Sequence, residues 1–226
     1  MSGSLSKALE TGVNPGRWEA AYLRFETPEE EIRKFLGRLK KLGADRWPRD
    51  SEIIELFCGR GNGLHALHHM GFTRLHGVDL SPRLLAEYKG PAETRLCDCR
   101  RLTFADRSCD IAIVQGGLHH LPKLLEDLHQ TLAEAHRVLR KDGILMAVEP
   151  WRTPFLRLAH AAASNPVTRR MWHKLDALQT MTELEIITYE QWLGQPKTIL
   201  SCLQRYFQPE QCLFRWGKLL FIGRKK

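Results

Sequence analysis

Long apolar runs are missing from this sequence, and their absence excludes whole classes of protein. No stretch approaches the ~20 consecutive apolar residues of a membrane span, so we expect no membrane-spanning segment. The N-terminal stretch MSGSLSKALETGVNPGRW lacks the apolar segment that a signal peptide needs. We therefore expect a soluble, cytoplasmic protein.

Cysteine does not occur in the patterns that stabilise small or metal-bound scaffolds. The six cysteines are Cys58, Cys97, Cys99, Cys109, Cys202 and Cys212. They lie in or beside apolar segments, which indicates reduced thiols rather than disulfides. Cys97 and Cys99 do not have zinc-finger spacing, and His65, His68 and His69 have no glutamate in the H-E-x-x-H register. We therefore expect no metal site.

Charge and length leave several functions open. The chain has 34 lysine and arginine residues against 26 aspartate and glutamate residues, a formal net charge of +8. That balance is compatible with nucleic acid, anionic lipid or a small acidic substrate. With 226 residues and 43% hydrophobic content, the chain can form one domain with an ordinary buried core.

Short apolar runs alternate with helical patterns through the middle of the chain. The expected strands cover 52–57, 74–78, 94–97, 110–115 and 144–149, and the expected helices lie near 63–70, 82–88 and 122–140. Such alternation is typical of a parallel sheet with helices on both faces. Strands at 211–216 and 218–222 would add an antiparallel hairpin at Gly217. The sequence therefore predicts a doubly wound, Rossmann-like α/β fold with a seven-stranded, mostly parallel sheet.

Helical segments flank this core. Thr27-Pro28-Glu29-Glu30 is the pattern of a helix start with a capping box, and that helix should end at Gly43. Residues 151–206 contain helical stretches at 154–163 and 183–193 but no strand. We interpret the chain, 1–226, as one domain. Its parts are an N-terminal helical cap (1–50), a ligand-binding core (51–150), a helical insert that covers the substrate (151–206) and a C-terminal β-hairpin (207–226).

The stretch IIELFCGRGNG, residues 53–63, places three glycines directly after a strand. Glycine lets backbone amides approach a ligand at the carboxyl end of a strand. A dinucleotide-binding loop would need glycine at Leu64, and a phosphate-binding loop would need a lysine that is absent. Asp79 and Asp98 follow the next two strands, where they could bind a ribose and an adenine amino group. The series indicates a nucleoside with a cationic tail.

These residues resemble the class I S-adenosylmethionine-dependent methyltransferases, in particular the ubiquinone/menaquinone-methyltransferase-like (type 11) group. The resemblance runs from about Ile53 to Pro150, and its pieces follow one another in the order of the family. They are Glu55-Leu56-Phe57-Cys58-Gly59-Arg60-Gly61, Gly77-Val78-Asp79-Leu80-Ser81, Cys97-Asp98-Cys99, Asp110-Ile111, Leu118-His119-His120-Leu121, Arg137-Val138-Leu139 through Gly143, and Glu149-Pro150. The sequence departs from the family at Phe57, which takes the place of the first loop glycine.

The resemblance implies S-adenosyl-L-methionine as the cofactor and S-adenosyl-L-homocysteine as the product. Gly59 and Gly61 would lie under the methionine part, Asp79 would bind the ribose hydroxyls, and Glu55 would orient the amino group. Capping the next helix is the alternative role for Glu55. The other implied cofactor residues are Asp98 and the Cys99 amide at the adenine, with Phe57, Cys58, Leu80, Gln115 and Gly116.

Two histidines are the candidates for catalysis. His119 and His120 follow the fourth strand, the position that faces the transferred methyl group in this fold. Either one could act as a base or bind the substrate. The family often uses such a pair only to shape the cofactor pocket, and this alternative stays open.

Residues outside the core are candidates for binding the methyl acceptor. Arg169 and Arg170 belong to a stretch, 151–175, with five basic residues and no acidic one. We interpret that stretch as the site of an acceptor with a carboxylate or phosphate, with a solvated helix face as the alternative. Tyr22 could close over the cofactor and Trp151 could line an apolar pocket, although both could instead pack in the core.

The expected reaction is methyl transfer to a small-molecule acceptor. Nucleic acid is the less expected partner, because Gln115-Gly116-Gly117-Leu118-His119 is not the Asn/Asp-Pro-Pro-aromatic sequence that clamps a base amino group. A nucleic-acid methyltransferase and a non-catalytic S-adenosylmethionine-binding partner protein stay as alternatives.

Overall fold

The computed structural model describes residues 15–226, so the start of the predicted N-terminal cap lies outside the described residues. Its centre is a seven-stranded sheet in the order β3-β2-β1-β4-β5-β7-β6. The strands are β1 (Ile53–Leu56), β2 (Leu75–Asp79), β3 (Glu93–Leu96), β4 (Cys109–Gln115), β5 (Leu139–Pro150), β6 (Phe207–Arg215) and β7 (Lys218–Lys225). Strands β1 to β5 pair in parallel, and β7 pairs antiparallel with β5 and β6. This arrangement confirms the predicted fold class.

The strand order brings the predicted ligand-binding residues to one edge of the sheet. β1 lies between β2 and β4, with Ile53 opposite Leu75 on one side and Ile111 on the other. The carboxyl ends of these parallel strands therefore meet, and the chain order reverses between β1 and β4. A reversal of this kind forms the crevice in which α/β sheets bind ligands.

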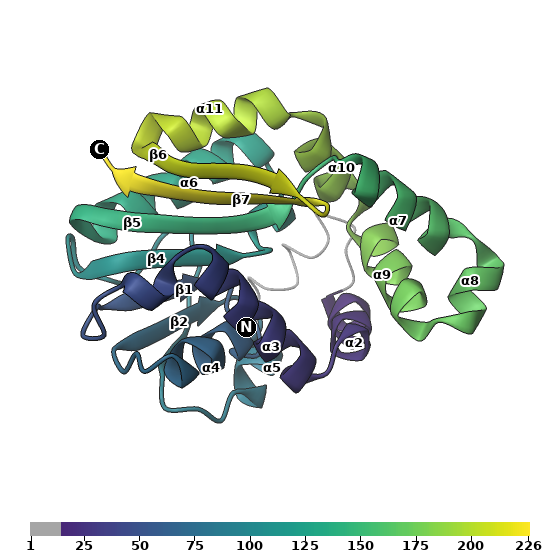
Figure 1. Ribbon diagram of the computed structural model, residues 1–226, viewed down its shortest axis with the longest axis horizontal. Helices are drawn as coiled ribbons and strands as arrows, with labels where there is room; N and C mark the ends of the chain where they lie inside the picture. The colour runs from purple at the N-terminus through teal and green to yellow at the C-terminus, as the bar shows by residue number, and fades with distance from the viewer. Residues whose placement is uncertain (1–14) are drawn as a thin grey trace, which may run out of the picture.

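Helices cover both faces of the sheet (Figure 1). One layer holds α3 (Pro28–Lys41), α4 (Asn62–His69) and α5 (Pro82–Glu87), and the other holds α6 (Leu124–Val138), α10 (Ile186–Gly194) and α11 (Pro196–Tyr206). Leu39 of α3 and Leu132 of α6 belong to the two apolar clusters that join these layers to the sheet. Burying each such leucine contributes roughly 1.5–3 kcal/mol, so the layers hold the strands firmly in place.

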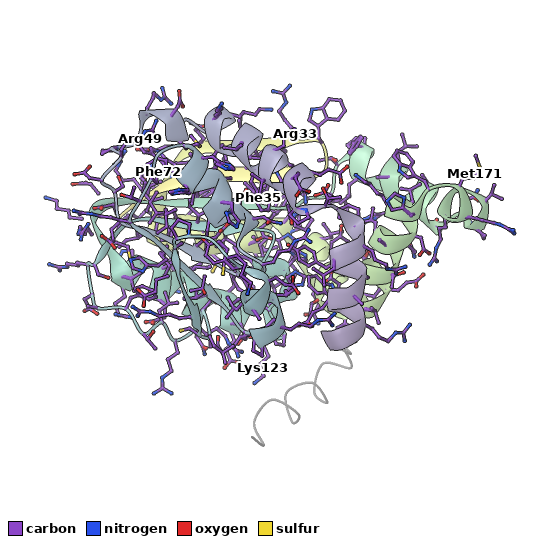
Figure 2. The ribbon with its side chains drawn as sticks, turned by 90° about the horizontal axis from the view of Figure 1, so that it is seen from below. Arg33, Phe35, Arg49, Phe72, Lys123 and Met171 are labelled. Carbon is purple, nitrogen blue, oxygen red and sulfur yellow. The ribbon has the colours of Figure 1, made fainter. Side chains whose placement is uncertain are left out.

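The α3 face also shows how polar side chains cover its apolar cluster. Phe35 and Phe72 lie on this face, and Phe72 is fully buried (Figure 2). The Arg49 guanidinium lies over the Phe72 ring, 4.6 Å from its centroid. The aromatic ring is therefore shielded from solvent by a cation that it also attracts.

Four helices lie beyond the carboxyl ends of the parallel strands (Figure 1). They are α2 (Pro15–Phe25), α7 (Pro154–Ser164), α8 (Pro166–Met171) and α9 (His173–Leu184). Helix α2 packs against α9, and Met171 lies at the outer end of the insert (Figure 2). The crevice is thus covered from two sides by segments far apart in the sequence.

Helix α3 begins as predicted. The Thr27 hydroxyl accepts a hydrogen bond from the Glu30 amide at 3.3 Å, and the Glu30 carboxylate accepts one from the Thr27 amide at 3.2 Å. This reciprocal pair is a capping box. Gly43 follows the helix with a φ of 85°, a conformation that favours glycine.

Several predicted elements differ from the structure. The helix expected over 183–193 is broken at Glu185, whose φ and ψ of −118° and 21° are not helical. The helix expected to reach 140 ends at Val138, because β5 already begins there and pairs Leu139 with Cys109. Strand β6 starts four residues before the expected hairpin strand, and α2 was not expected.

Among residues 15–226, no helix is long and apolar enough to cross a membrane. All six cysteines have free thiols. Burial raises the pKa of the Cys58 and Cys99 thiols well above the usual value, so both are protonated at neutral pH. These two thiols are therefore packing groups rather than nucleophiles.

Candidate active site

The loop after β1 has the backbone conformation that its glycines allow. Gly59 and Gly61 have φ of 54° and 75°, and Phe57 has a φ of 56°. Phe57 thus takes the backbone conformation of the glycine that it replaces, which costs roughly 1–2 kcal/mol for a residue with a side chain. Its ring fits because Gly117 has no side chain: a Cβ there would lie 2.2 Å from the ring.

Asp79, at the end of β2, ties this loop to the next one. Its Oδ2 accepts a hydrogen bond from the Gly59 amide and its Oδ1 accepts one from the Ser81 amide, both at 2.8 Å. Burial raises the pKa of Asp79, whereas these backbone bonds lower it. The carboxylate is therefore fixed beside the glycine loop, where a ribose-binding acid is expected.

Two buried acceptors beside the loop lack a donor. Glu55 is 2% exposed; its Oε1 accepts a hydrogen bond from Gln115 Nε2 at 3.4 Å, and the Leu64 amide of α4 also donates to it. Glu55 Oε2 and Gln115 Oε1 have no hydrogen-bond partner among residues 15–226. Buried acceptors normally have one, so the pair fits a cationic donor such as the ammonium group of S-adenosylmethionine. Leu64 lies in the first turn of α4, so capping that helix stays the alternative role of Glu55.

Burial also shifts the charge state of Glu55. Desolvation raises its pKa to about 8, and the hydrogen bonds from Gln115 and Leu64 only partly oppose that effect. A Cβ on Gly63 would lie 1.9 Å from Glu55 Oε1, so the glycine of the first turn of α4 is what admits the carboxyl group there. The third glycine of the loop, Gly63, therefore leaves the space that the Glu55 carboxyl group occupies.

Asp98 and Cys99 follow β3 as expected, but Asp98 already has a partner. Arg100 donates to Asp98 Oδ2 at 2.7 Å and to Asp127 of α6 at 2.8 Å. An adenine amino group at this position would therefore share the Asp98 carboxylate with Arg100. The role of Asp98 at the adenine stays a prediction.

The structure places the other expected cofactor residues at this edge with different exposures. Cys58 is buried, whereas Leu80 is 56% exposed. Gly116 has a φ of 86°, which turns the chain from β4 into the short 3₁₀ helix η2 (Leu118–His120). Whether each one contacts a cofactor stays a prediction.

His119 and His120 lie on η2, and each meets a carboxylate. His119 Nδ1 is 2.7 Å from Glu149 Oε2, and His120 Nδ1 is 2.6 Å from Glu185 Oε2. The Gly117 and Leu118 amides donate to Glu149 Oε1, both at 2.9 Å. A neutral His119 that donates from Nδ1 to Glu149 leaves its Nε2 as an acceptor. That nitrogen is 3.9 Å from Glu185 Oε1.

The two imidazoles differ in charge. Burial lowers the pKa of His119, and the neighbouring His120 lowers it further, so His119 is neutral. Burial also opposes the charged form of His120, but the Glu185 carboxylate outweighs this effect and raises its pKa. The pair is therefore polarised, with positive charge favoured on the ring nearer Glu185.

Helix α2 covers both ends of the crevice. Glu19 accepts a hydrogen bond from the Ser81 hydroxyl, next to Asp79. Trp18 meets His120 edge to face, with ring centroids 5.0 Å apart. One side of a single helix thus reaches the expected ribose position and the histidine pair, so α2 is a lid over the site.

A buried ion pair anchors this lid to the glycine loop. Arg60, between the two loop glycines, donates to Glu31 of α3 at 3.0 Å, and each side chain is 7% exposed. The Glu31 carboxylate also accepts hydrogen bonds from Asn62 at 2.7 Å and from the Tyr22 hydroxyl at 3.0 Å. Tyr22 therefore holds α2 to the loop, and its closing over the cofactor stays a prediction.

The residues expected to bind an anionic acceptor are only partly available. Arg169 donates to Asp176 at 2.8 Å and to Glu183 at 3.2 Å, so its charge is already compensated within the insert. Arg170 is exposed on α8. Trp151 is 8% exposed and stacks on Phe214, which supports packing rather than substrate recognition.

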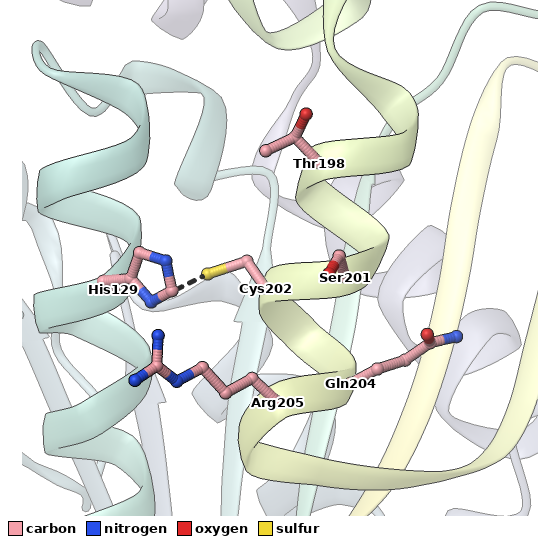
Figure 3. A pocket seen from close by; sticks show the side chains of 6 residues that line it. All are labelled: His129, Thr198, Ser201, Cys202, Gln204 and Arg205. Carbon is pink, nitrogen blue, oxygen red and sulfur yellow. Dashed lines mark hydrogen bonds between the residues drawn. The ribbon is translucent and has the colours of Figure 1, made fainter.

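A shallow groove on the other helix layer is a less suitable site. It lies between α6 and α11 and is lined by His129, Thr198, Ser201, Cys202, Gln204 and Arg205 (Figure 3). Its closest polar contact joins Cys202 Sγ and His129 Nδ1 at 3.4 Å. Burial raises the pKa of the Cys202 thiol to about 11, so this is no activated nucleophile.

Several residues of the site could not be recognised from the sequence. Glu149 was matched as part of a motif but received no role, although its place at the end of the fifth strand was a usable signal. Trp18 in α2, Glu31 in α3 and Glu185 between α9 and α10 carry no sequence signal of a role in the site, and only the folded chain brings them to it.

Comparisons with known proteins show what the core of the chain is similar to. Residues 54–147 match a family model described as a methyltransferase domain. The demethylmenaquinone methyltransferase of Chlorobaculum parvum is 27% identical over 143 residues, which are 54% of this chain and 58% of that protein. That of Chlorobaculum tepidum is 28% identical over 134 residues, 51% of this chain and 54% of that protein. The chain thus spans a little over half the length of these curated relatives.

Solved structures extend the likeness to most of the chain. A protein of Pyrococcus horikoshii has a TM-score of 0.62 at 18% identity, over 86% of this chain and 91% of its own. A geranyl diphosphate methyltransferase in complex with S-adenosylmethionine has a TM-score of 0.61 at 14% identity, over 88% of this chain and 86% of its own. At these identities the likeness establishes the fold.

Proposed function

We propose that this chain is a class I S-adenosylmethionine-dependent methyltransferase of the type 11 group and that it transfers a methyl group from S-adenosylmethionine to a small molecule. The match of residues 54–147 to a methyltransferase domain and the alignment of about half of the chain with two demethylmenaquinone methyltransferases support this proposal. The orphaned acceptors of Glu55 and Gln115, beside the loop fixed by Asp79, carry the proposal. The relatives are named for demethylmenaquinone and for geranyl diphosphate, which supports a small-molecule acceptor here.

The chain's own residues have distinct parts in this proposal. Glu55 and Gln115 would bind the ammonium group, and Asp79 would accept the ribose hydroxyls. The bound cofactor supplies a methyl group already activated by its sulfonium. The protein then needs to hold an acceptor in line with that methyl group and to exclude water, and such positioning can contribute several kcal/mol. We place the methyl acceptor at the other end of the site, beside His119 and His120, where Trp18 of the lid contacts His120.

Binding and transfer can be measured separately. We expect S-adenosylhomocysteine to bind one-to-one in a calorimetric titration of the full chain. With methyl-labelled S-adenosylmethionine and a deproteinised, nuclease-treated cell extract, we expect label in the small-molecule fraction. No binding heat would contradict the cofactor assignment. If label appears only when the nuclease treatment is omitted, and then in the RNA, the result would instead support the nucleic-acid alternative.

Cofactor affinity should depend on the protonation of Glu55. Its pKa of about 8 means that the free protein holds the proton below that pH, whereas an ammonium ligand needs the carboxylate. Binding must therefore release a proton, and the affinity for S-adenosylhomocysteine should rise about tenfold per pH unit from pH 6 to 7, levelling off above 8. Calorimetry in two buffers of different ionisation enthalpy measures the release. Glu55→Gln should remove it, and an unchanged release in that variant would contradict the assignment.

An anionic acceptor is the narrower form of the proposal. Arg170 is the exposed cation of the predicted pair, since Arg169 is bound by Asp176 and Glu183. Once an acceptor is known, Arg170→Ala should raise its KM several-fold with little change in kcat. An unchanged KM in the Arg169→Ala/Arg170→Ala double variant would exclude these residues from acceptor binding.

A further inference from the structure

We propose that His119, His120 and Glu185 bind a divalent transition-metal cation, with zinc as the best match, at the acceptor end of the site. Each of the three residues offers one ligand atom, and these atoms lie within 4.8 Å of one another. No spacing motif in the sequence predicts this set of ligands, because Glu185 comes close to the two histidines only in the folded chain. The proposal revises our expectation that the chain has no metal site.

The distances suit a small tetrahedral cation. Zinc binds imidazole nitrogen and carboxylate oxygen at about 2.0–2.2 Å, which places neighbouring ligand atoms about 3.3 Å apart. His119 Nε2 is 3.9 Å from Glu185 Oε1, and His120 Nδ1 is 2.6 Å from Glu185 Oε2. These two separations differ from that value by about 0.6 and 0.7 Å, so binding of the ion requires only small side-chain adjustments. Three protein ligands leave a fourth position for water or substrate.

A second carboxylate already orients the first histidine. Glu149 Oε2 lies 2.7 Å from His119 Nδ1, and the Gly117 and Leu118 amides hold Glu149 Oε1 at 2.9 Å. This arrangement turns His119 Nε2 toward Glu185 and fixes the tautomer. A carboxylate bound to the distal nitrogen of a histidine is the usual support of a metal-binding imidazole.

The two buried carboxylates of the cluster also favour a bound cation. Glu149 is fully buried and Glu185 is 8% exposed. Within residues 15–226, no lysine or arginine lies within 4.0 Å of either carboxylate. Glu185 can pair with a protonated His120, and Glu149 accepts hydrogen bonds from two backbone amides and meets His119, so the two carboxylates have little positive charge near them. A divalent cation at the cluster would compensate both.

One carboxylate oxygen points to the same position. Glu185 Oε2 is buried and has no hydrogen bond of acceptable geometry in the described part of the chain, although His120 Nδ1 is only 2.6 Å away. A cation that binds between the two side chains would use the lone pair of this oxygen.

The site deepens the proposed function and rests on it for its role. A hydroxyl or thiol of the acceptor that bound in the fourth position would lose its proton to solvent and be held as the anion. An anion is the stronger nucleophile toward a sulfonium methyl group, so neither histidine would need to act as a base. Cation binding itself does not depend on methyl transfer.

Metal binding can be tested on the full chain without cofactor or acceptor. After dialysis against a chelator, we expect one Zn²⁺ per chain by calorimetry. Substituted Co²⁺ should give the visible bands of a four-coordinate ion without an intense thiolate charge-transfer band. Glu185→Gln and His120→Gln should each weaken Zn²⁺ binding at least tenfold, and Glu149→Gln about 10- to 100-fold. The matched control is Glu190→Gln, which alters an exposed glutamate of α10 paired with Arg152 and should leave the affinity unchanged.

Three outcomes would overturn the site. They are the absence of one-to-one binding, a thiolate band that assigns the ion to the free cysteines, and equal affinity in the Glu185→Gln and His120→Gln variants with retained circular dichroism. If S-adenosylhomocysteine also fails to bind, the proposed function fails independently. If only Zn²⁺ fails to bind, the four side chains form a proton-relay cluster and the proposed function stands.

Discussion

Asp79→Asn is expected to weaken the binding of S-adenosylhomocysteine about 100-fold. The variant keeps the size of the side chain but loses its charge and one acceptor oxygen. In the structure that carboxylate holds the Gly59 and Ser81 amides at 2.8 Å each, and it would also accept the ribose hydroxyls. Hydrogen bonds to a charged group contribute roughly 1.5–3 kcal/mol each, and about 1.4 kcal/mol corresponds to a tenfold change in affinity. Calorimetric titration measures the loss.

The chain offers a matched control for this variant. Asp110 also accepts a backbone hydrogen bond, from the Glu52 amide at 2.8 Å, and it pairs with Arg140. It lies near the start of β4, at the opposite edge of the sheet. Asp110→Asn should leave the affinity for S-adenosylhomocysteine unchanged. If Asp79→Asn binds within twofold of the original chain while it stays folded, the assigned cofactor position is wrong.

Arg60→Met is expected to lower the free energy of unfolding by about 3–5 kcal/mol, the usual cost of removing one partner of a buried ion pair. The substitution leaves the Glu31 carboxylate buried with only Asn62 and Tyr22 as donors. In a chain of this size that loss lowers the melting temperature by roughly 2–4 °C per kcal/mol. Urea denaturation followed by circular dichroism measures it.

Two further variants separate the ion pair from general effects of arginine removal. Arg152 pairs with Glu190 and both side chains are about half exposed, so Arg152→Met should cost less than about 1 kcal/mol. The double variant Glu31→Gln/Arg60→Met removes both charges and should recover part of the stability. Equal stability of Arg60→Met and Arg152→Met would show that the buried pair contributes nothing special.

The cofactor edge could be predicted from the sequence because its residues follow strands. Gly59, Asp79 and Asp98 each come at or just after a strand end, and parallel strands bring their carboxyl ends together whatever the details of packing. Periodicity therefore sufficed to place them. What it could not give was the state of each side chain, such as the pairing of Asp98 with Arg100.

The cover of the site could not be predicted in the same way. Trp18 of α2 and Glu185 between α9 and α10 reach the histidines across more than sixty residues of sequence, and no local rule couples such segments. The break at Glu185 also lacks glycine or proline, so the helical pattern runs through it. Its backbone leaves the helix without either residue, and only the folded structure shows the turn.

Because the Phe57 ring packs against Gly117, the residue that one position tolerates depends on the residue at the other. A Cβ at 117 would overlap the ring, and a glycine at 57 would relieve the backbone but leave the space above Gly117 empty. A larger residue at 117 alone therefore clashes, and a smaller residue at 57 alone leaves a void. Replacing Phe57 by a small residue and Gly117 by a larger one at the same time avoids both. Libraries that aim to reshape this crevice should change the two codons together.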